Sequence, residues 1–198
     1  MKSLVGIIGG LRKKERSHDV EQTRPKFSLS AGSVQRHELG AIQRAIDAAN
    51  KINGPIVEIG ALFGMTTIKL AKWKLPDKKI LAVDNFAWNP LGLSPIEHQE
   101  LTRGVLGFLL DRGDVEIVVS GKDEFFQSYK ETPPSMVFVD AIHSYEETLR
   151  DIENAKRIGA RIIAGHDYSE EFPGVVQAVN ESGGPAELTG SVWLLQSV

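Results

Sequence analysis

Acidic residues and histidines follow several apolar runs in this sequence. Asp140 ends one run and His143 lies just beyond it, while the next run ends in Gly165-His166-Asp167-Tyr168. Two carboxylates at neighbouring strand ends can share a hard divalent cation through oxygen ligands. An imidazole titrates close to neutral pH, which makes a nearby histidine a candidate general base. The sequence therefore predicts Asp140, His143 and His166 as catalytic residues, and Asp140 with Asp167 as metal ligands.

Each of these residues also has a purely structural interpretation. Asp140 is placed where it could cap a helix that starts near Ser144, and His143 could hydrogen-bond to loop backbone. His166 and Asp167 could form a turn pair, since aspartate is common where strands end. The spacing alone leaves these alternatives open.

A second group of residues forms a glycine-containing turn, Glu58-x-Gly60-x-x-x-Gly64, ahead of a helical pattern. Glycine lets the backbone approach a ligand closely. Asp84, about 20 residues further on, is placed to bind the two hydroxyls of a ribose. The dinucleotide fingerprint G-x-G-x-x-G is not met, because Leu62 stands at its second glycine. Glu58 would oppose a pyrophosphate and attract an ammonium, so the turn favours S-adenosylmethionine over NAD; a plain turn between strand and helix is the structural alternative.

The elements that carry these residues alternate regularly along the chain. Short runs rich in Ile and Val predict strands at residues 55–60, 79–84, 115–120, 135–140 and 160–166. Helical spacing predicts helices at residues 33–52, 66–73, 96–110, 123–129, 144–158 and 174–181. A closing antiparallel hairpin is expected from residues 186–188 and 192–196. The pattern indicates an α/β fold with a doubly wound, Rossmann-like, mostly parallel sheet.

Two local signals refine this expectation. Gly54 is expected to end the first helix in a left-handed conformation, and Ser144 with Glu147 predicts a capping box at the start of the fifth.

Composition limits the remaining classes of protein. The 198 residues fit one domain at residues 34–198, preceded by a partly irregular segment at 1–33. A net charge of −3 argues against a broad, positively charged surface that binds nucleic acid. The absence of cysteine excludes disulfides, thiolate nucleophiles and cysteine-ligated zinc, and fits a cytoplasmic protein. No apolar run approaches the ~20 residues of a membrane helix, and residues 4–11 lack the flanking features of a secretory signal.

Residues 55–168 resemble the class I S-adenosylmethionine-dependent methyltransferases. The resemblance extends to the branch called methyltransferase family 24, which is related to macrocin O-methyltransferase and cephalosporin-hydroxylase-like proteins. It is carried by VEIGALFGMTT at 57–67, AVD at 82–84, FVDAIHSYE at 138–146 and GHDY at 165–168. It implies a seven-stranded sheet and transfer of a methyl group to a hydroxyl of a small-molecule acceptor. It also implies a Mg²⁺-like ion that orients the substrate oxygen and lowers its pKa.

The same resemblance implies a set of cofactor contacts. Glu58, Gly60 and Gly64 would line the methionine end, and Asp84 would hold the ribose. Gly121 and Lys122 would lie near the adenine, where the family often has an acid in place of Gly121. The full predicted set is Glu58, Gly60, Ala61, Gly64, Asp84, Asn85, Gly121, Lys122 and Asp140.

Two other functions stay open at this point. An NAD(P)-dependent oxidoreductase could use a similar sheet, although Leu62 and Glu58 speak against it. A non-catalytic S-adenosylmethionine-binding protein is compatible with Gly121 and with the short chain. A nucleic-acid methyltransferase is disfavoured by the slightly acidic charge and the absence of cysteine. The expected partner is therefore a small-molecule acceptor. Binding to nucleic acid or to a membrane is not expected, and whether the protein forms a homo-oligomer is left open.

Overall fold

The structure is a computed structural model in which residues 34–195 are described. The predicted segment at residues 1–33 and the end of the chain at 196–198 lie outside the described residues. Seven strands form one sheet: β1 (Ile56–Ile59), β2 (Ile80–Asp84), β3 (Val115–Val119), β4 (Met136–Val139), β5 (Ile163–Gly165), β6 (Pro185–Thr189) and β7 (Val192–Leu195).

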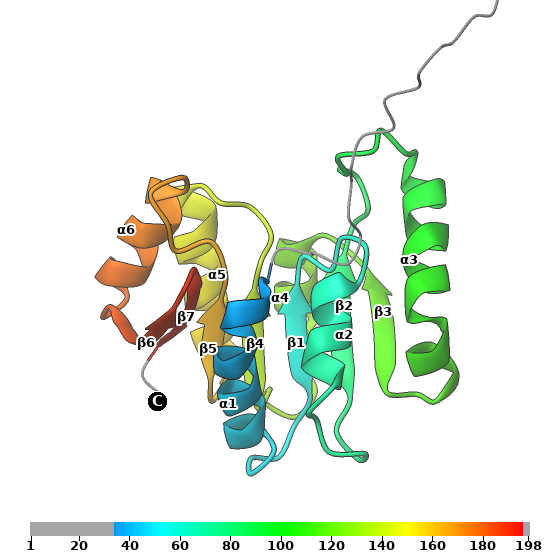
Figure 1. Cartoon of the computed structure of the whole chain (residues 1–198), viewed down its shortest axis with the longest axis horizontal. Coiled ribbons are helices and arrows are strands. Elements are labelled where there is room, and N and C mark those ends of the chain that lie inside the picture. Colours follow the sequence, from blue (N-terminus) through cyan, green and yellow to red (C-terminus); the bar gives the residue numbers. More distant parts are fainter. Residues whose placement is uncertain (1–33, 196–198) are drawn as a thin grey trace, which may run out of the picture.

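The strand order is β3-β2-β1-β4-β5-β7-β6 (Figure 1). Strand β1 pairs in parallel with both β2 and β4, and β4 pairs in parallel with β5. Strand β7 is antiparallel to both of its neighbours, β5 and β6. The predicted doubly wound, mostly parallel sheet with a closing hairpin is thus confirmed. The order reverses between β1 and β4, which is where open α/β sheets bind ligands at their carboxyl edge.

Helices cover both faces of the sheet. They are α1 (Leu39–Ala49), α2 (Met65–Ala71), α3 (Pro95–Asp111), α4 (Lys122–Ser128), α5 (Tyr145–Arg157) and α6 (Pro173–Glu181), with a short 3-10 helix η1 (Arg36–Glu38) before α1. One buried cluster joins the sheet to α1, α2 and α3, and the other joins its opposite face to α4, α5 and α6. Figure 1 views α1 and α2 in front of the strands. Within residues 34–195, no helix has the length and apolarity needed to cross a membrane.

Alternation of side chains along β1 explains how one strand serves both clusters. Ile56 belongs to the cluster under α1–α3, while Val57 and Ile59 belong to the cluster under α4–α6. All residues of β1 and β4 are buried. A central parallel strand covered on both faces is therefore buried throughout and, apart from Glu58, apolar, as its sequence predicted.

Several predicted boundaries are wrong by a few residues. The first helix ends at Ala49, and Gly54 takes its left-handed φ of 105° in the turn before β1, beyond the helix end. At Ser144 only half of the predicted capping box forms: its hydroxyl accepts from Glu147 N at 3.3 Å. The Glu147 carboxylate instead lies 2.8 Å from Lys122 Nζ, because an ammonium competes better for it than a backbone amide.

Candidate functional site

Gly60 ends β1 and lets the first turn pack against the end of β4. Its φ is 93°, and a Cβ built on it would lie 2.2 Å from the backbone oxygen of Asp140. Any larger residue would therefore push β4 away or unwind the turn. Gly64, with φ 78°, closes the turn as the N-cap of α2.

Asp84 ends β2 and binds two backbone amides of neighbouring turns. Its Oδ2 accepts from Leu62 N at 2.8 Å, and its Oδ1 accepts from Phe86 N at 2.7 Å. Leu62 and Phe86 both have positive φ, 47° and 55°. An ionised carboxylate offers about four lone-pair sites, so one remains on each oxygen. Asp84 can thus hold both turns and still accept hydrogen bonds from the hydroxyls of a ribose.

Glu58 lies in β1 with no exposed surface. Its Oε2 accepts a 2.5 Å hydrogen bond from Thr67 Oγ1 of α2, and its Oε1 has no hydrogen-bond partner. Burial raises the pKa of Glu58 well above its ordinary value. The side chain therefore sits beneath the glycine turn, joined to α2, rather than on the surface of the carboxyl edge.

The other predicted cofactor residues lie in varied surroundings. Ala61 is buried and belongs to the core under α1–α3. Asn85 is exposed, and its Oδ1 accepts from Ala87 N at 3.0 Å. Gly121 is the N-cap of α4, and a Cβ on it would meet nothing within 4 Å. Lys122 directs its Nζ to α5, 2.6 Å from Asp151 Oδ1. The Lys122 side chain is thus engaged with α5, and the space beside Gly121 is open.

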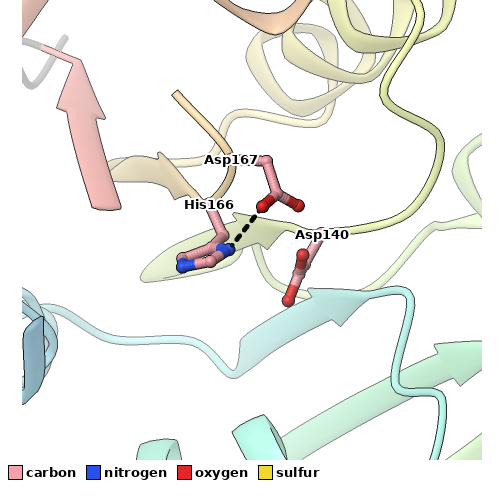
Figure 2. A group of neighbouring side chains, drawn as sticks. All are labelled: Asp140, His166 and Asp167. Carbon is pink, nitrogen blue, oxygen red and sulfur yellow. Dashed lines mark ion pairs between the residues drawn. The ribbon is translucent and has the colours of Figure 1, made fainter. Parts of the chain in front are cut away.

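Asp140, His166 and Asp167 gather at the ends of β4 and β5 (Figure 2). Each offers one ligand atom, and these atoms all lie within 4.8 Å of one another. The predicted pair Asp140 and Asp167 is therefore brought together, and His166, predicted only as a base, joins it. Two carboxylates and an imidazole form a donor set that fits a divalent cation.

A chain of alternating acids and imidazoles extends from this group. His143 Nε2 lies 2.9 Å from Asp167 Oδ2 and 4.0 Å from Asp140 Oδ1. His166 Nδ1 lies 3.0 Å from Asp167 Oδ1, and its Nε2 lies 3.1 Å from Glu38 Oε2. Asp167 therefore faces a different histidine with each of its oxygens.

The acids and imidazoles of this cluster shift one another's pKa values strongly. Burial would lower the pKa of His166, but its hydrogen bond with Asp167 and the charge of Asp140 raise it to about 9. The hydrogen bond with Asp167 raises the pKa of His143. Burial would raise the pKa of Asp167, but the two histidines lower it. Such opposed shifts within one group of side chains are typical of functional sites.

The structure can also be compared with the purely structural interpretations of Asp140, His143 and Asp167. The helix after β4 is capped by Ser144, so Asp140 is not its cap. His143 contacts Asp167 and the ring of Phe172, whose centroid is 4.5 Å away. Asp167 does occupy a turn, with φ 63°, and its carbonyl accepts from Ser169 N at 2.8 Å. The turn thus presents the Asp167 carboxylate to both histidines.

Sequence reasoning missed the residues that hold His166 from the other side. Glu38 of η1 is 1% exposed, and its Oε1 accepts from both the backbone amide (2.6 Å) and the hydroxyl (2.9 Å) of Ser191. Ser191 Oγ also lies 2.8 Å from His166 Nε2. Glu38 and Ser191 come from opposite ends of the described chain, so no local spacing could have linked them.

Comparisons with known proteins give the fold a clear set of neighbours. No protein-family model matches the chain, and no curated protein matches it. An O-methyltransferase from Bacillus cereus in complex with SAH superposes with a TM-score of 0.59 at 19% identity, covering 76% of this chain and 69% of that chain. CalS11, a TDP-rhamnose 3'-O-methyltransferase of calicheamicin biosynthesis, gives a TM-score of 0.60 at 18% identity, covering 82% and 80%. The cofactor-bound protein Rv0187 from MTB gives 0.57 at 21% identity, covering 80% and 71%.

These likenesses establish the fold. The sheet and its flanking helices are those of S-adenosylmethionine-dependent O-methyltransferases, as the sequence resemblance implied. The narrower assignment to methyltransferase family 24 has no matching family model. The activity has to be argued from the site, because one fold supports many functions.

Proposed function

We propose that residues 34–198 form an S-adenosylmethionine-dependent methyltransferase domain that methylates a hydroxyl group of a small molecule. One observation carries this proposal. The cluster of Asp140, His143, His166 and Asp167 lies at the ends of β4 and β5 in a sheet with the O-methyltransferase fold. Asp140 is next to the switch point and to the turn that Asp84 organises. The fold neighbours, which include SAH-bound and cofactor-bound proteins, support the choice of cofactor.

Asp84 and the glycine turn are the residues that would hold the cofactor. Asp84 has one lone pair left on each oxygen for the ribose hydroxyls. Gly60 and Gly64 let the turn pack closely against the Asp140 carbonyl and Leu106, so that its backbone would line the methionine end. Glu58 is buried and has a raised pKa, so we assign it to supporting the turn through Thr67 rather than to binding the cofactor's ammonium.

Asp140, His166 and Asp167 would hold a divalent cation. Such an ion lowers the pKa of an acceptor hydroxyl and orients it. Carboxylates suit Mg²⁺ and Mn²⁺, while an imidazole suits transition metals, so the mixed set favours Mn²⁺ over Mg²⁺. His166 has to lose its proton to serve as a ligand, so cation binding should release a proton and strengthen as pH rises.

His143 is the residue we assign as general base. Its side chain is 33% exposed, whereas that of His166 is 5% exposed and held by Glu38. With the ring hydrogen assigned to Nε2, which lies 2.9 Å from Asp167 Oδ2, the lone pair of the neutral ring lies on Nδ1. S-adenosylmethionine would supply the methyl group, its carbon–sulfur bond breaking as the carbon–oxygen bond forms. The hydroxyl proton passes to His143 Nδ1, and Asp167 stabilises the resulting imidazolium.

Calorimetric titration with S-adenosylmethionine, S-adenosylhomocysteine and NADH tests the cofactor, each with and without Mn²⁺. We expect the first two to bind and NADH not to bind. Asp84→Asn should weaken S-adenosylhomocysteine about 10- to 100-fold, because hydrogen bonds to a charged group are lost. Asp47→Asn, on the exposed face of α1, is the matched control. Tight NADH binding without binding of S-adenosylhomocysteine would replace the proposal by an oxidoreductase.

The acceptor is tested with labelled S-adenosylmethionine and a panel of hydroxyl compounds. The panel should include a nucleotide sugar, as used by the neighbour CalS11, and a phenol. Methyl transfer that disappears in Asp140→Asn and Asp167→Asn supports the assigned centre. Cofactor binding without transfer to any member would indicate a non-catalytic binding protein.

A further inference from the structure

We propose that His98 of α3 is a positioning residue. Its imidazole holds two turns, one at Leu62 and one at Phe86, in the conformation that binds the cofactor; these two turns are called the cofactor cradle below. The inference rests on the proposed function only for what the cradle binds. His98 has no exposed surface. It belongs neither to the Asp140 cluster nor to the turns themselves, and sequence reasoning gave it no role.

His98 contacts the same two residues that Asp84 contacts, but on their carbonyl side. Its Nε2 lies 3.1 Å from Leu62 O, and its Nδ1 lies 3.4 Å from Phe86 O. Asp84 accepts the amide hydrogens of Leu62 and Phe86. Asp84 thus accepts from one residue in each turn. The neutral ring of His98 has one N–H, and the shorter Nε2 distance assigns its donation to Leu62 O, while Nδ1 contacts Phe86 O.

The two clamped residues need such restraint. Leu62 and Phe86 have positive φ values, which non-glycine residues rarely adopt because they strain the backbone. Their conformations persist only when the surroundings determine them. Since Asp84 is fixed by these same amides, a relaxed turn would also release the carboxylate that we assign to the ribose.

Helix α3 is built to present His98 to the turns. Its buried residues are His98, Thr102 and Leu106, spaced four apart on one face. Thr102 Oγ1 donates to Leu62 O at 2.7 Å, and Leu106 lies where a Cβ on Gly64 would be. A helix face that buries two polar side chains against backbone carbonyls is unusual for simple core packing, because buried polar groups are stabilising only when paired.

Aromatic rings fix the imidazole in place. The ring of Phe63 lies 4.8 Å from that of His98 and the ring of Phe86 lies 5.0 Å from it, both edge to face. Phe63 belongs to the first turn and Phe86 to the second. Each turn thus contacts His98 by one side chain and one carbonyl.

Amide hydrogen exchange, read residue by residue by NMR, tests the clamp without any ligand. His98→Leu should speed exchange of the Leu62 and Phe86 amides by about tenfold or more relative to global opening, as a lost buried hydrogen bond implies. Ile42→Ala, in the core of α1, is the control for general destabilisation and should leave that ratio unchanged.

Two conservative variants keep the test decisive if His98→Leu does not fold. The side-chain amide of Asn can replace Nδ1 and that of Gln can replace Nε2. With the imidazole hydrogen on Nε2, His98→Gln should therefore preserve slow exchange at Leu62, and His98→Asn should not. Equal exchange at both amides in wild type, His98→Asn and His98→Gln would overturn the clamp.

S-adenosylhomocysteine titration then links the clamp to binding. Affinity should fall about tenfold in His98→Leu and be unchanged in Ile42→Ala; an unchanged affinity in His98→Leu would overturn the positioning role. If the wild-type protein binds no S-adenosylhomocysteine, the proposed function fails, and the exchange data alone decide whether His98 clamps the turns.

Discussion

Asp167 determines the charge balance of the candidate site. Each of its oxygens faces a different histidine, and its backbone sits at φ 63° in the turn after β5. Because it serves both imidazoles, its removal would leave two raised histidine pKa values without their main cause. Asp167 is thus assigned two roles, orientation of His143 and ligation of a cation.

The base assignment predicts a selective loss of rate in His143→Gln. Methyl transfer should fall about 10²- to 10⁴-fold, the usual contribution of a positioned general base. S-adenosylhomocysteine affinity should not change, because His143 is placed at the acceptor. His37→Gln replaces an exposed histidine and provides the control. A full rate in His143→Gln would remove His143 from the mechanism.

The raised pKa of His166 predicts how stability of the metal-free protein depends on pH. The folded-state pKa of about 9 lies above the ordinary value of 6.5, so protonation favours the folded state. This contribution, up to about 3 kcal/mol, is complete below pH ~6.5 and is lost as pH rises through about 9. His143 acts in the same direction, and Asp167 is ionised in both states throughout this window.

Urea unfolding in the presence of a chelator, from pH 6 to pH 10, measures this effect. His166→Gln should flatten most of the decline between about pH 6.5 and 9. A decline of the same size in that variant would assign it to other groups.

At the scale of elements, the contact between the ends of β1 and β4 depends on Gly60. Gly60→Ala should destabilise the protein by several kcal/mol, because positive φ strain is joined by a clash with Asp140 O. Gly92 is the matched control: its φ is 68°, but a Cβ there meets nothing within 4 Å. Gly92→Ala should cost only about 1 kcal/mol. Equal losses in chemical denaturation would show that the close approach has no energetic role.

Helix α3 stands at the β3 side of the sheet (Figure 1) and depends on a well-formed N-terminus. Ser94 Oγ accepts from Glu97 N, and the Glu97 carboxylate accepts from Ser94 N, so the capping box absent at Ser144 is found here. His98 follows immediately. Loosening the first turn of α3 should therefore affect the cradle as well as the helix.

Ser94→Ala should lower stability by about 1 kcal/mol, the usual value of a lost N-cap. It should also weaken S-adenosylhomocysteine severalfold through His98. Ser128→Ala, at an exposed serine of α4, should do neither. Thermal unfolding and calorimetry measure the two effects. Unchanged affinity in a destabilised Ser94→Ala protein would show that His98 is held independently of the cap.

At the scale of the whole molecule, the cluster joins segments distant in sequence. Glu38 comes from η1, Asp140 follows β4, His166 and Asp167 follow β5, and Ser191 lies between β6 and β7. Groups brought together only by folding bind a cation in the native state and not in the unfolded state. Cation binding is therefore expected to stabilise the entire domain.

Mn²⁺ at about 100 times its Kd should add roughly 2.7 kcal/mol to the free energy of unfolding. For a chain of this size that raises Tm by about 5–10 °C. Asp140→Asn should abolish the rise and Asp47→Asn should retain it, as followed by scanning calorimetry. A rise that persists in Asp140→Asn would place the ion elsewhere.

The fold was predictable because its signals were redundant. Buried strands, helical periodicity and a glycine turn after β1 all indicate one topology, and the observed sheet agrees. Boundaries were less accurate where competing interactions decide them. The fifth strand was predicted at 160–166 but spans Ile163–Gly165, since only these residues pair with β4.

The gathering of side chains at the candidate site was predictable for residues that end strands, and it was not predictable for the others. Asp140 and Asp167 could be found because parallel strands bring their carboxyl ends to one edge. Glu38 and Ser191 reach His166 only through tertiary packing of the first and last described elements. His98 could have been suspected from the polar stripe at 98, 102 and 106, but its carbonyl partners depend on two turns whose φ values no pattern reveals.

The placement of Trp193 and Trp88 makes tryptophan fluorescence a probe of this architecture. Its indole has no exposed surface and donates from Nε1 to His166 O at 2.9 Å, directly beneath the acid–imidazole cluster. Trp88, shortly after the Asp84 turn, is 71% exposed. Indole emission is blue in a dry setting and red in water, and a quencher such as iodide reaches only the exposed ring. Two of the three tryptophans are therefore built-in fluorophores of different colour, one beneath the proposed cation site and one beside the proposed cradle, and they can report the two occupancies without a label.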